Sequence, residues 1–82
     1  MYVYVLHSLK DGKRYVGIAH DVVKRLAEHN SGRVFSTKGR RPFVIVHSEL
    51  YGTVAAARSK EKYYKSTAGR RALEMSGPHE GA

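Results

Sequence analysis

The chain has 82 residues, among which 15 Lys and Arg outnumber 7 Asp and Glu and give a formal net charge of +8. This length leads us to expect one domain with a thin core rather than a two-domain enzyme. The absence of cysteine excludes disulfide scaffolds, cysteine-type zinc sites and thiol chemistry, and it is in keeping with a cytoplasmic protein. No apolar run approaches the roughly 18 residues of a membrane span, and no segment has the bulky apolar face of a basic helix that binds a membrane surface. The positive charge therefore favours a nucleic acid as partner.

The first element in the sequence is a predicted β-hairpin. Residues 2–7 form a run rich in aromatic and β-branched side chains. Because both faces of this strand are mostly apolar, we expect it to lie inside a sheet that is covered on both sides. Asp11 and Gly12 form a pair that tolerates positive φ and predicts the turn. The second strand is expected over residues 14–18.

A helix is predicted over residues 22–29, with Asp21 as its N-cap. Its apolar stripe is expected to consist of Val22, Val23, Leu26 and Ala27. Arg25 and His29 are four residues apart, so they lie on one side of the helix and flank that stripe. They form either a solvated basic edge or a phosphate clamp, in which Arg donates paired hydrogen bonds and His exchanges a proton near neutral pH.

A polar and basic connection follows over residues 30–42. Its cationic side chains are Arg33, Lys38, Arg40 and Arg41. We expect these four side chains to contact the phosphate backbone of a nucleic acid, because Lys and Arg neutralise phosphates. Such contacts position a protein on its substrate without reading the base sequence, so the loop predicts no sequence preference.

The remaining elements are one strand and two helices. The strand is expected over residues 43–50, the longer helix over residues 54–65, and the last helix ends at about Met75. Residues 76–82 contain Gly and Pro but no core residue, so we expect them to be a disordered tail. The order of elements, ββαβαα, predicts an α+β domain over residues 1–75, with a three-stranded, mostly antiparallel sheet flanked by helices.

One residue of the longer helix does not fit the face on which it lies. The spacing of a buried seam is followed by Val54, Ala57, Glu61 and Tyr64. A carboxylate in such a row is costly unless it is paired or bound to a cation. Glu61 therefore either forms an ion pair with Arg58 or Lys65, or it is a metal ligand. A single carboxylate with several waters and a substrate phosphate suits Mg²⁺.

Tyr4 and Tyr15 lie on the two paired strands of the predicted hairpin. Strand tyrosines are most often packing residues whose hydroxyl group has a hydrogen-bond partner. A second interpretation stays open for both residues. A phenol beside a metal ion or another cation has its pKa lowered and can act as a base.

Taken together, these motifs resemble the GIY-YIG nuclease superfamily, and in particular its small stand-alone bacterial members. Tyr2–Leu6 stands in the place of the G-I-Y strand, with Tyr2 where the motif has Gly, and Arg14–Ile18 stands in the place of Y-I-G. Further segments match in the family's order: Asp21–Leu26, Glu28–Gly32, Arg40–Phe43, Ala57–Glu61 and Lys65–Arg70. The resemblance covers residues 2–73, nearly the whole chain.

The resemblance implies a divalent-metal-dependent endonuclease that hydrolyses DNA phosphodiester bonds, with a role in DNA repair or recombination. Glu61 would hold one Mg²⁺ or Mn²⁺ ion, which binds the scissile phosphate and stabilises the leaving 3′-oxygen. Tyr4 would help to deprotonate the attacking water. Tyr15, Arg25 and His29 would position the phosphate and neutralise its developing charge.

Two other functions remain open. The same fold is also compatible with a non-catalytic nucleic-acid-binding module, for DNA or RNA, whose binding is sensitive to salt and independent of metal. A protein-interaction domain would instead dock an acidic partner through its basic surface, with binding that survives high salt. For the nuclease, we expect branched, damaged or single-stranded DNA as the substrate.

Overall fold

The sheet of the protein has three strands, with the first strand of the chain at its centre. In a computed structural model that describes residues 1–76, the elements follow the order β1 (Tyr2–Ser8), β2 (Arg14–Ala19), α1 (Val22–Asn30), a short 3-10 helix η1 (Lys38–Arg40), β3 (Phe43–Leu50), α2 (Val54–Lys65) and α3 (Thr67–Ser76). The strand order is β2-β1-β3, and β1 is antiparallel to both neighbours. The expected α+β fold with an antiparallel sheet flanked by helices is confirmed.

The hairpin that joins β1 to β2 depends on the Asp11-Gly12 turn. Gly12 has a φ of 73°, a conformation that a residue without Cβ adopts at no steric cost. The Asp11 carboxylate accepts a hydrogen bond from the Lys13 N–H at 2.9 Å, and this bond stabilises the turn. The turn sets the register in which Tyr4 lies opposite Gly17.

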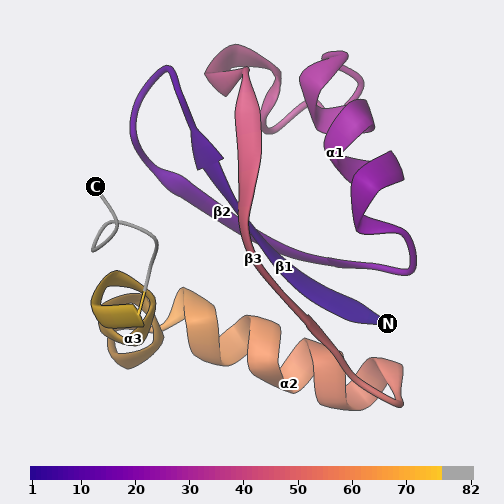
Figure 1. The fold of residues 1–82 in the computed structure, drawn as a ribbon, viewed down its shortest axis with the longest axis vertical. Helices are drawn as coiled ribbons and strands as arrows, with labels where there is room; N and C mark the ends of the chain where they lie inside the picture. Colours follow the sequence, from indigo (N-terminus) through magenta and orange to yellow (C-terminus); the bar gives the residue numbers. More distant parts are fainter. Residues whose placement is uncertain (77–82) are drawn as a thin grey trace.

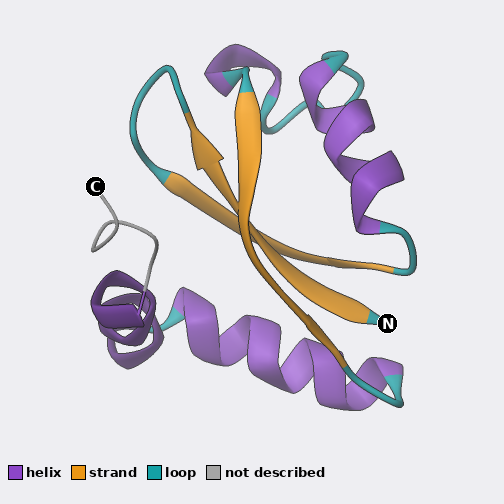
Figure 2. Cartoon of the chain, viewed as in Figure 1, coloured by secondary structure: helices purple, strands orange, loops and turns teal. Residues whose placement is uncertain are grey.

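The core lies on both faces of the sheet, because the side chains of β1 alternate between them. Val3 and Val5 pack with Ala57, Tyr64 and Leu73 of α2 and α3. On the other face, Tyr4, Leu6 and Phe43 pack with Val22 and Leu26 of α1. Figures 1 and 2 show the twisted sheet between α1 on one side and α2 and α3 on the other. Residues 3–6 are at most 1% exposed, as expected for a strand covered on both sides.

The apolar stripe of α1 differs from the expected one. Val22 and Leu26 pack on the sheet, but Val23 is 74% exposed and Ala27 is also exposed. Residues three or four apart share one face of a helix, so the buried row continues from Val22 and Leu26 to His29. A histidine thus takes the third core position of this helix.

The last helix is slightly longer than expected. α3 includes Ser76, which the sequence analysis assigned to the tail. Residues 77–82 lie outside the described part of the chain, so the disordered tail stays a prediction. Among residues 1–76, no helix is long and apolar enough to cross a membrane.

Candidate active site

A chain of hydrogen bonds runs from the centre of the sheet to the basic loop. The Tyr4 hydroxyl lies 3.0 Å from His29 Nε2, and His29 Nδ1 lies 2.7 Å from the Thr37 hydroxyl oxygen. The Thr37 hydroxyl in turn donates to the carbonyl oxygen of Val34. Tyr4, His29 and Thr37 are at most 1% exposed, so each polar atom of this chain depends on its neighbour for a partner.

The direction of these bonds assigns the tautomer of His29. Because the Thr37 hydroxyl uses its proton for the Val34 carbonyl, its oxygen accepts the proton of Nδ1–H. Nε2 is then the unprotonated nitrogen and accepts a hydrogen bond from the Tyr4 hydroxyl. Burial, and secondly the positive charge of Arg25, lower the pKa of His29 below its ordinary value. The imidazole is therefore neutral at pH 7 and can take a proton from Tyr4.

Gly17 makes room for the Tyr4 phenol. A Cβ at this position would lie 2.5 Å from the Tyr4 hydroxyl oxygen and 2.7 Å from Cζ, a distance that side-chain atoms do not tolerate. Gly17 faces Tyr4 across the β1–β2 pair, so the hairpin itself creates the space. The third aromatic ring of the site belongs to Tyr15 of β2, whose centroid lies 4.9 Å from that of His29 and 6.3 Å from that of Tyr4.

Arg25 supplies the positive charge of this site. Its Nη1 donates to Glu28 at 2.9 Å, and its guanidinium also interacts with the Tyr4 phenol. The two partners, Glu28 first, raise the pKa of Arg25, so the side chain remains a cation. Burial raises the pKa of Tyr4, although the interaction with Arg25 opposes the rise. Tyr4 thus keeps its proton at pH 7 until a base accepts it.

Glu61 lies on the sheet-facing side of α2, between the buried residues Ala57 and Tyr64. Its side chain is 20% exposed and accepts a hydrogen bond from Lys65 Nζ at 3.1 Å. Both interpretations of Glu61 therefore have support, since the carboxylate is partly buried and also forms an ion pair. After burial, which is the main cause, the negative charge of Glu61 also raises the pKa of Tyr4, so the carboxylate is within electrostatic reach of the phenol.

The Glu61 carboxylate is the kind of ligand that a hard divalent cation accepts. Residues 1–76 contain no cluster of three His, Cys, Asp or Glu side chains that would form an all-protein metal cage. Mg²⁺ is commonly bound by one or two carboxylates together with waters and substrate phosphates, and a partly exposed carboxylate leaves space for such ligands. The Glu61 carboxylate oxygens would hold the ion, in place of the ammonium group of Lys65.

The family model for the GIY-YIG catalytic domain matches residues 1–74. The chain belongs to the GIY-YIG family. It is 35% identical over 75 residues to a UPF0213 protein of Staphylococcus saprophyticus, with 90% of each chain covered. A UPF0213 protein of the archaeon Haloquadratum walsbyi is 41% identical over 66 residues, covering 79% of this chain and 73% of the relative. A third, from Listeria monocytogenes, is 40% identical over 65 residues, covering 78% and 72%. No solved structure matches significantly.

Membership of the GIY-YIG family confirms the resemblance that the motifs indicated. It makes the chain a nuclease-type hydrolase domain with nucleic acid as its substrate. The structure brings together Tyr4, Tyr15, Arg25 and His29 around one point on the α1 side of the sheet edge. Glu61 lies on α2, and what connects it to this group is the effect of its charge on the pKa of Tyr4, after burial as the main cause.

The four cationic side chains that were predicted to contact nucleic acid do not all lie in the same surroundings. Arg33, Lys38 and Arg41 are exposed on the loop between α1 and β3. Arg40 instead turns toward the hairpin, where its Nε donates to Asp11 at 3.0 Å. Contact of these four side chains with nucleic acid stays a prediction.

Three residues that build the candidate site were given no role from the sequence. Thr37 fixes the tautomer of His29, whereas Gly17 and Asn30 entered only as letters of the motifs Arg14–Ile18 and Glu28–Gly32. Asn30 holds the start of β3, because its side chain donates to the Phe43 carbonyl at 3.0 Å and accepts from the Phe43 N–H at 2.7 Å. A polar residue in a loop without periodicity gives no signal, so Thr37 is visible only in the folded chain.

Proposed function

We propose that this protein is a cytoplasmic, divalent-metal-dependent endonuclease that hydrolyses DNA phosphodiester bonds and acts in DNA repair or recombination. The observation that carries the proposal is the buried hydrogen bond between Tyr4 and a neutral His29. This pair lies beside a cation, Arg25, and within reach of the Glu61 carboxylate. A proton acceptor, a cation and a metal-binding carboxylate are the groups that phosphodiester hydrolysis requires.

The Tyr4–His29 pair provides a path for one proton. His29 Nε2 takes the proton of the Tyr4 hydroxyl, and the Tyr4 oxygen takes a proton from the attacking water. The water oxygen then forms its bond to phosphorus while the bond to the 3′-oxygen breaks. Thr37 keeps the imidazole in the tautomer that accepts at Nε2, so the proton moves from Tyr4 to His29.

Charge on the phosphate is balanced by side chains of the candidate active site. Arg25 donates to phosphate oxygens and stabilises the negative charge that grows during attack. Tyr15 packs against His29 and limits where the phosphate can lie. A divalent ion held by Glu61 supplies Lewis-acid stabilisation of the phosphate and of the leaving oxygen when it is bound.

A nicking assay with Mg²⁺ or Mn²⁺ on supercoiled, branched and single-stranded DNA tests the proposal. We expect cleavage by the wild type and a loss of at least roughly 100-fold in Glu61→Gln and in His29→Gln, in the range of other lost catalytic groups. Lys62→Gln is the control, since Lys62 is an exposed residue of the same helix, α2, and belongs to neither the candidate site nor a salt bridge among residues 1–76. Undiminished cleavage by Glu61→Gln would remove Glu61 from the site and refute the mechanism.

One observation favours a second function, a non-catalytic module that binds DNA or RNA. The ammonium group of Lys65 lies 3.1 Å from Glu61 and already neutralises the carboxylate that would hold the metal. Such a module would bind nucleic acid equally well with and without EDTA and would give no products on any substrate. Cleavage that appears with Mn²⁺ and disappears with EDTA decides for the nuclease.

A further inference from the structure

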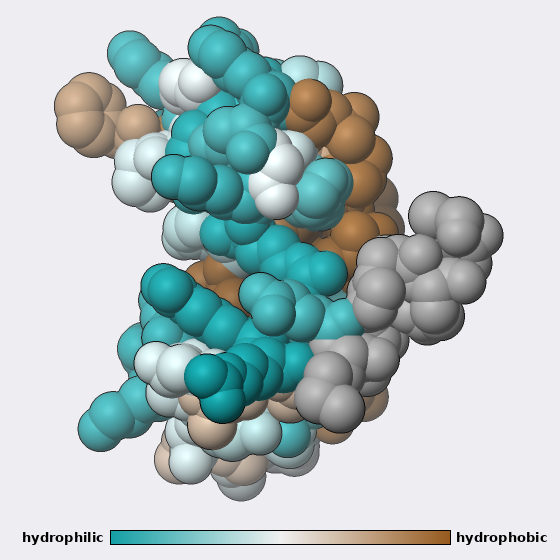
Figure 3. Space-filling model, turned by 90° about the vertical axis from the view of Figure 1, so that its left-hand side faces the viewer, coloured by the Kyte–Doolittle hydropathy of each residue, from teal (hydrophilic) through white to brown (hydrophobic). Residues whose placement is uncertain are grey.

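A groove with a volume of about 1000 Å³ opens beside the candidate active site. Its walls come from the β1–β2 hairpin and η1 on one side and from the junction of α2 and α3 on the other. Figure 3 shows this face of the molecule hollowed between two lobes that are mostly hydrophilic at the surface. Tyr15, a residue of the candidate active site, is part of the lining.

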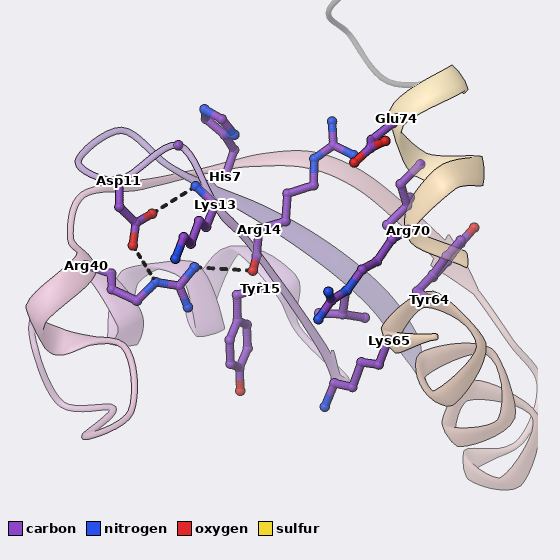
Figure 4. A pocket seen from close by; sticks show the side chains of 13 residues that line it. His7, Asp11, Lys13, Arg14, Tyr15, Arg40, Tyr64, Lys65, Arg70 and Glu74 are labelled. Carbon is purple, nitrogen blue, oxygen red and sulfur yellow. Dashed lines mark hydrogen bonds and ion pairs between the residues drawn. The ribbon is translucent and has the colours of Figure 1, made fainter. Parts of the chain in front are cut away.

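The groove is lined by more positive than negative side chains. The cations are Lys13, Arg14, Arg40, Lys65 and Arg70, against two carboxylates. One of the carboxylates, Asp11, is already paired with Arg40 at 3.0 Å. Figure 4 shows Lys13 and Arg40 on the hairpin side, Lys65 and Arg70 reaching in from the helices, and Tyr15 between them.

We propose that this groove binds the sugar–phosphate backbone of one polynucleotide strand and leads it to Tyr15. The proposal rests on the nuclease function and extends it, since it assigns a strand-binding site to residues outside the basic loop. Cations on two facing walls suit a chain of phosphates that passes between them, because each phosphate meets a cation on either side.

The size of the groove favours a single strand over a duplex. About 1000 Å³ is at the upper end of pockets that enclose one small ligand, so it holds a few nucleotides. A double helix, whose major groove alone is about 12 Å wide, does not enter such a recess. The protein itself measures only 28 × 28 × 20 Å.

The groove is also continuous with the catalytic residues. Tyr15 contributes its ring to the contact with His29 and also lines the groove. Lys65 lines the groove and binds Glu61. A strand that lies in the groove therefore contacts Tyr15 directly, and it passes Lys65, the ion-pair partner of the candidate metal ligand Glu61.

The test measures binding of single-stranded and duplex DNA of the same sequence by fluorescence anisotropy, in EDTA and over a range of salt concentrations. The groove variant is Lys13→Glu with Arg70→Glu, since both side chains are exposed and neither belongs to the catalytic group. The matched control is Lys24→Glu with Lys62→Glu, which changes the net charge equally at two exposed positions outside the groove. Circular dichroism verifies that both variants fold.

We expect the groove variant to bind single-stranded DNA at least tenfold more weakly than the control variant at low salt. The slope of log K against log salt concentration is about −0.7 per phosphate contact with a single strand, so the loss of two contacts should make the slope less negative by roughly 1.4. Because EDTA removes divalent metal ions, the assay measures binding without cleavage. The binding result therefore stays valid even if the protein proves not to be a nuclease.

Three results would overturn the proposal. An equal loss of affinity in both double variants would mean that only the net charge matters. If duplex DNA binds as tightly as the single strand, and the groove variant loses affinity for both to the same extent, a double helix occupies this surface. Displacement of the DNA by polyglutamate at equal charge concentration would assign the groove to an acidic protein partner.

Discussion

At the scale of single residues, His29 shows how one side chain serves both packing and chemistry. It fills the third core position of α1, where its ring contacts Tyr15 and Phe43. Both ring nitrogens are satisfied, by Tyr4 and by Thr37, so burial costs it no hydrogen bond. The same two bonds fix the orientation and the tautomer of the ring. A buried histidine that is fully satisfied is thereby also an oriented proton acceptor.

The space that Gly17 leaves for Tyr4 gives the first prediction. Gly17→Ala should lower the cleavage rate by roughly 100-fold, because the new Cβ would lie 2.5 Å from the Tyr4 hydroxyl oxygen and push it off His29. Gly52→Ala is the control, since no described heavy atom lies within 4 Å of a Cβ there. Rates are compared in the nicking assay, with circular dichroism to verify folding. An unchanged rate in Gly17→Ala would mean that the position of Tyr4 is not needed.

The charge state of His29 gives the second prediction. Because burial lowers its pKa, the neutral imidazole persists further into acid than that of an exposed histidine. The cleavage rate should therefore fall on the acid side with a midpoint below about 6.5, the ordinary value for histidine. The pH–rate profile of the wild type measures this midpoint, and the residual activity of His29→Gln should lack this step. A midpoint above 6.5 would contradict a neutral, buried base.

Sequence patterns are informative about these residues only where a motif or a periodicity exists. Tyr4, Tyr15, Arg25 and His29 stand in motifs, and the structure places them together. Glu61 was recognisable because a carboxylate in an apolar row is unusual. Thr37 was not recognisable, since it belongs to an irregular loop and its partner lies eight residues away.

At the scale of elements, local signals defined the helices well. The Asp21 carboxylate accepts from the Lys24 N–H at 3.0 Å, and the Thr53 hydroxyl accepts from the Ala56 N–H at 3.1 Å, as the N-cap rule requires. The 3-10 helix η1 and the exposure of Val23 were not predictable. Both depend on how α1 and the loop after it lie against the sheet, and this is decided by packing between distant segments.

A second polar cluster, formed by four side chains, connects β3 to α2. The Glu49 carboxylate accepts hydrogen bonds from Tyr51 and Tyr64 and contacts His47 Nε2. Burial alone would raise the pKa of Glu49, but these hydrogen bonds outweigh it and lower the pKa to about 2. His47 and Glu49 alternate with the exposed residues Ser48 and Leu50 along β3, and Tyr51 follows the strand and packs against the core under α2, so the cluster lies on the face that meets α2.

The Glu49 cluster gives the third prediction. Because the pKa of Glu49 is lower in the folded than in the unfolded chain, its stabilisation is complete above about pH 4.5 and is lost as the pH falls toward 2. The loss amounts to up to about 3 kcal/mol, at 1.36 kcal/mol per pKa unit. Urea unfolding of the wild type and Glu49→Gln measures it: the stability difference should shrink between pH 5 and pH 2. A stability difference that does not change with pH would contradict the low pKa of Glu49. Glu74→Gln, at an exposed position, is the control.

At the scale of the whole molecule, β1 belongs to both parts of the core. Its residues Val3 and Val5 pack under α2 and α3, while Tyr4 and Leu6 pack under α1. Neither side can therefore lose its packing without exposing one face of the central strand. The candidate site combines residues from both sides, Tyr4 and His29 from one and Glu61 from the other, so its geometry depends on the folding of the entire chain.

The shared central strand gives the last prediction, that the domain unfolds as one cooperative unit. Leu26→Ala removes a partly buried side chain from the α1 side and should cost about 2 kcal/mol, at the lower end for such substitutions. If the two sides are coupled through β1, the most protected amides of α2 should lose the same free energy of hydrogen exchange as those of α1. Native-state hydrogen exchange of the wild type and Leu26→Ala measures both helices at once. If only the amides of α1 lose protection, the two sides of the sheet unfold independently. The candidate site would then form only while both sides are folded.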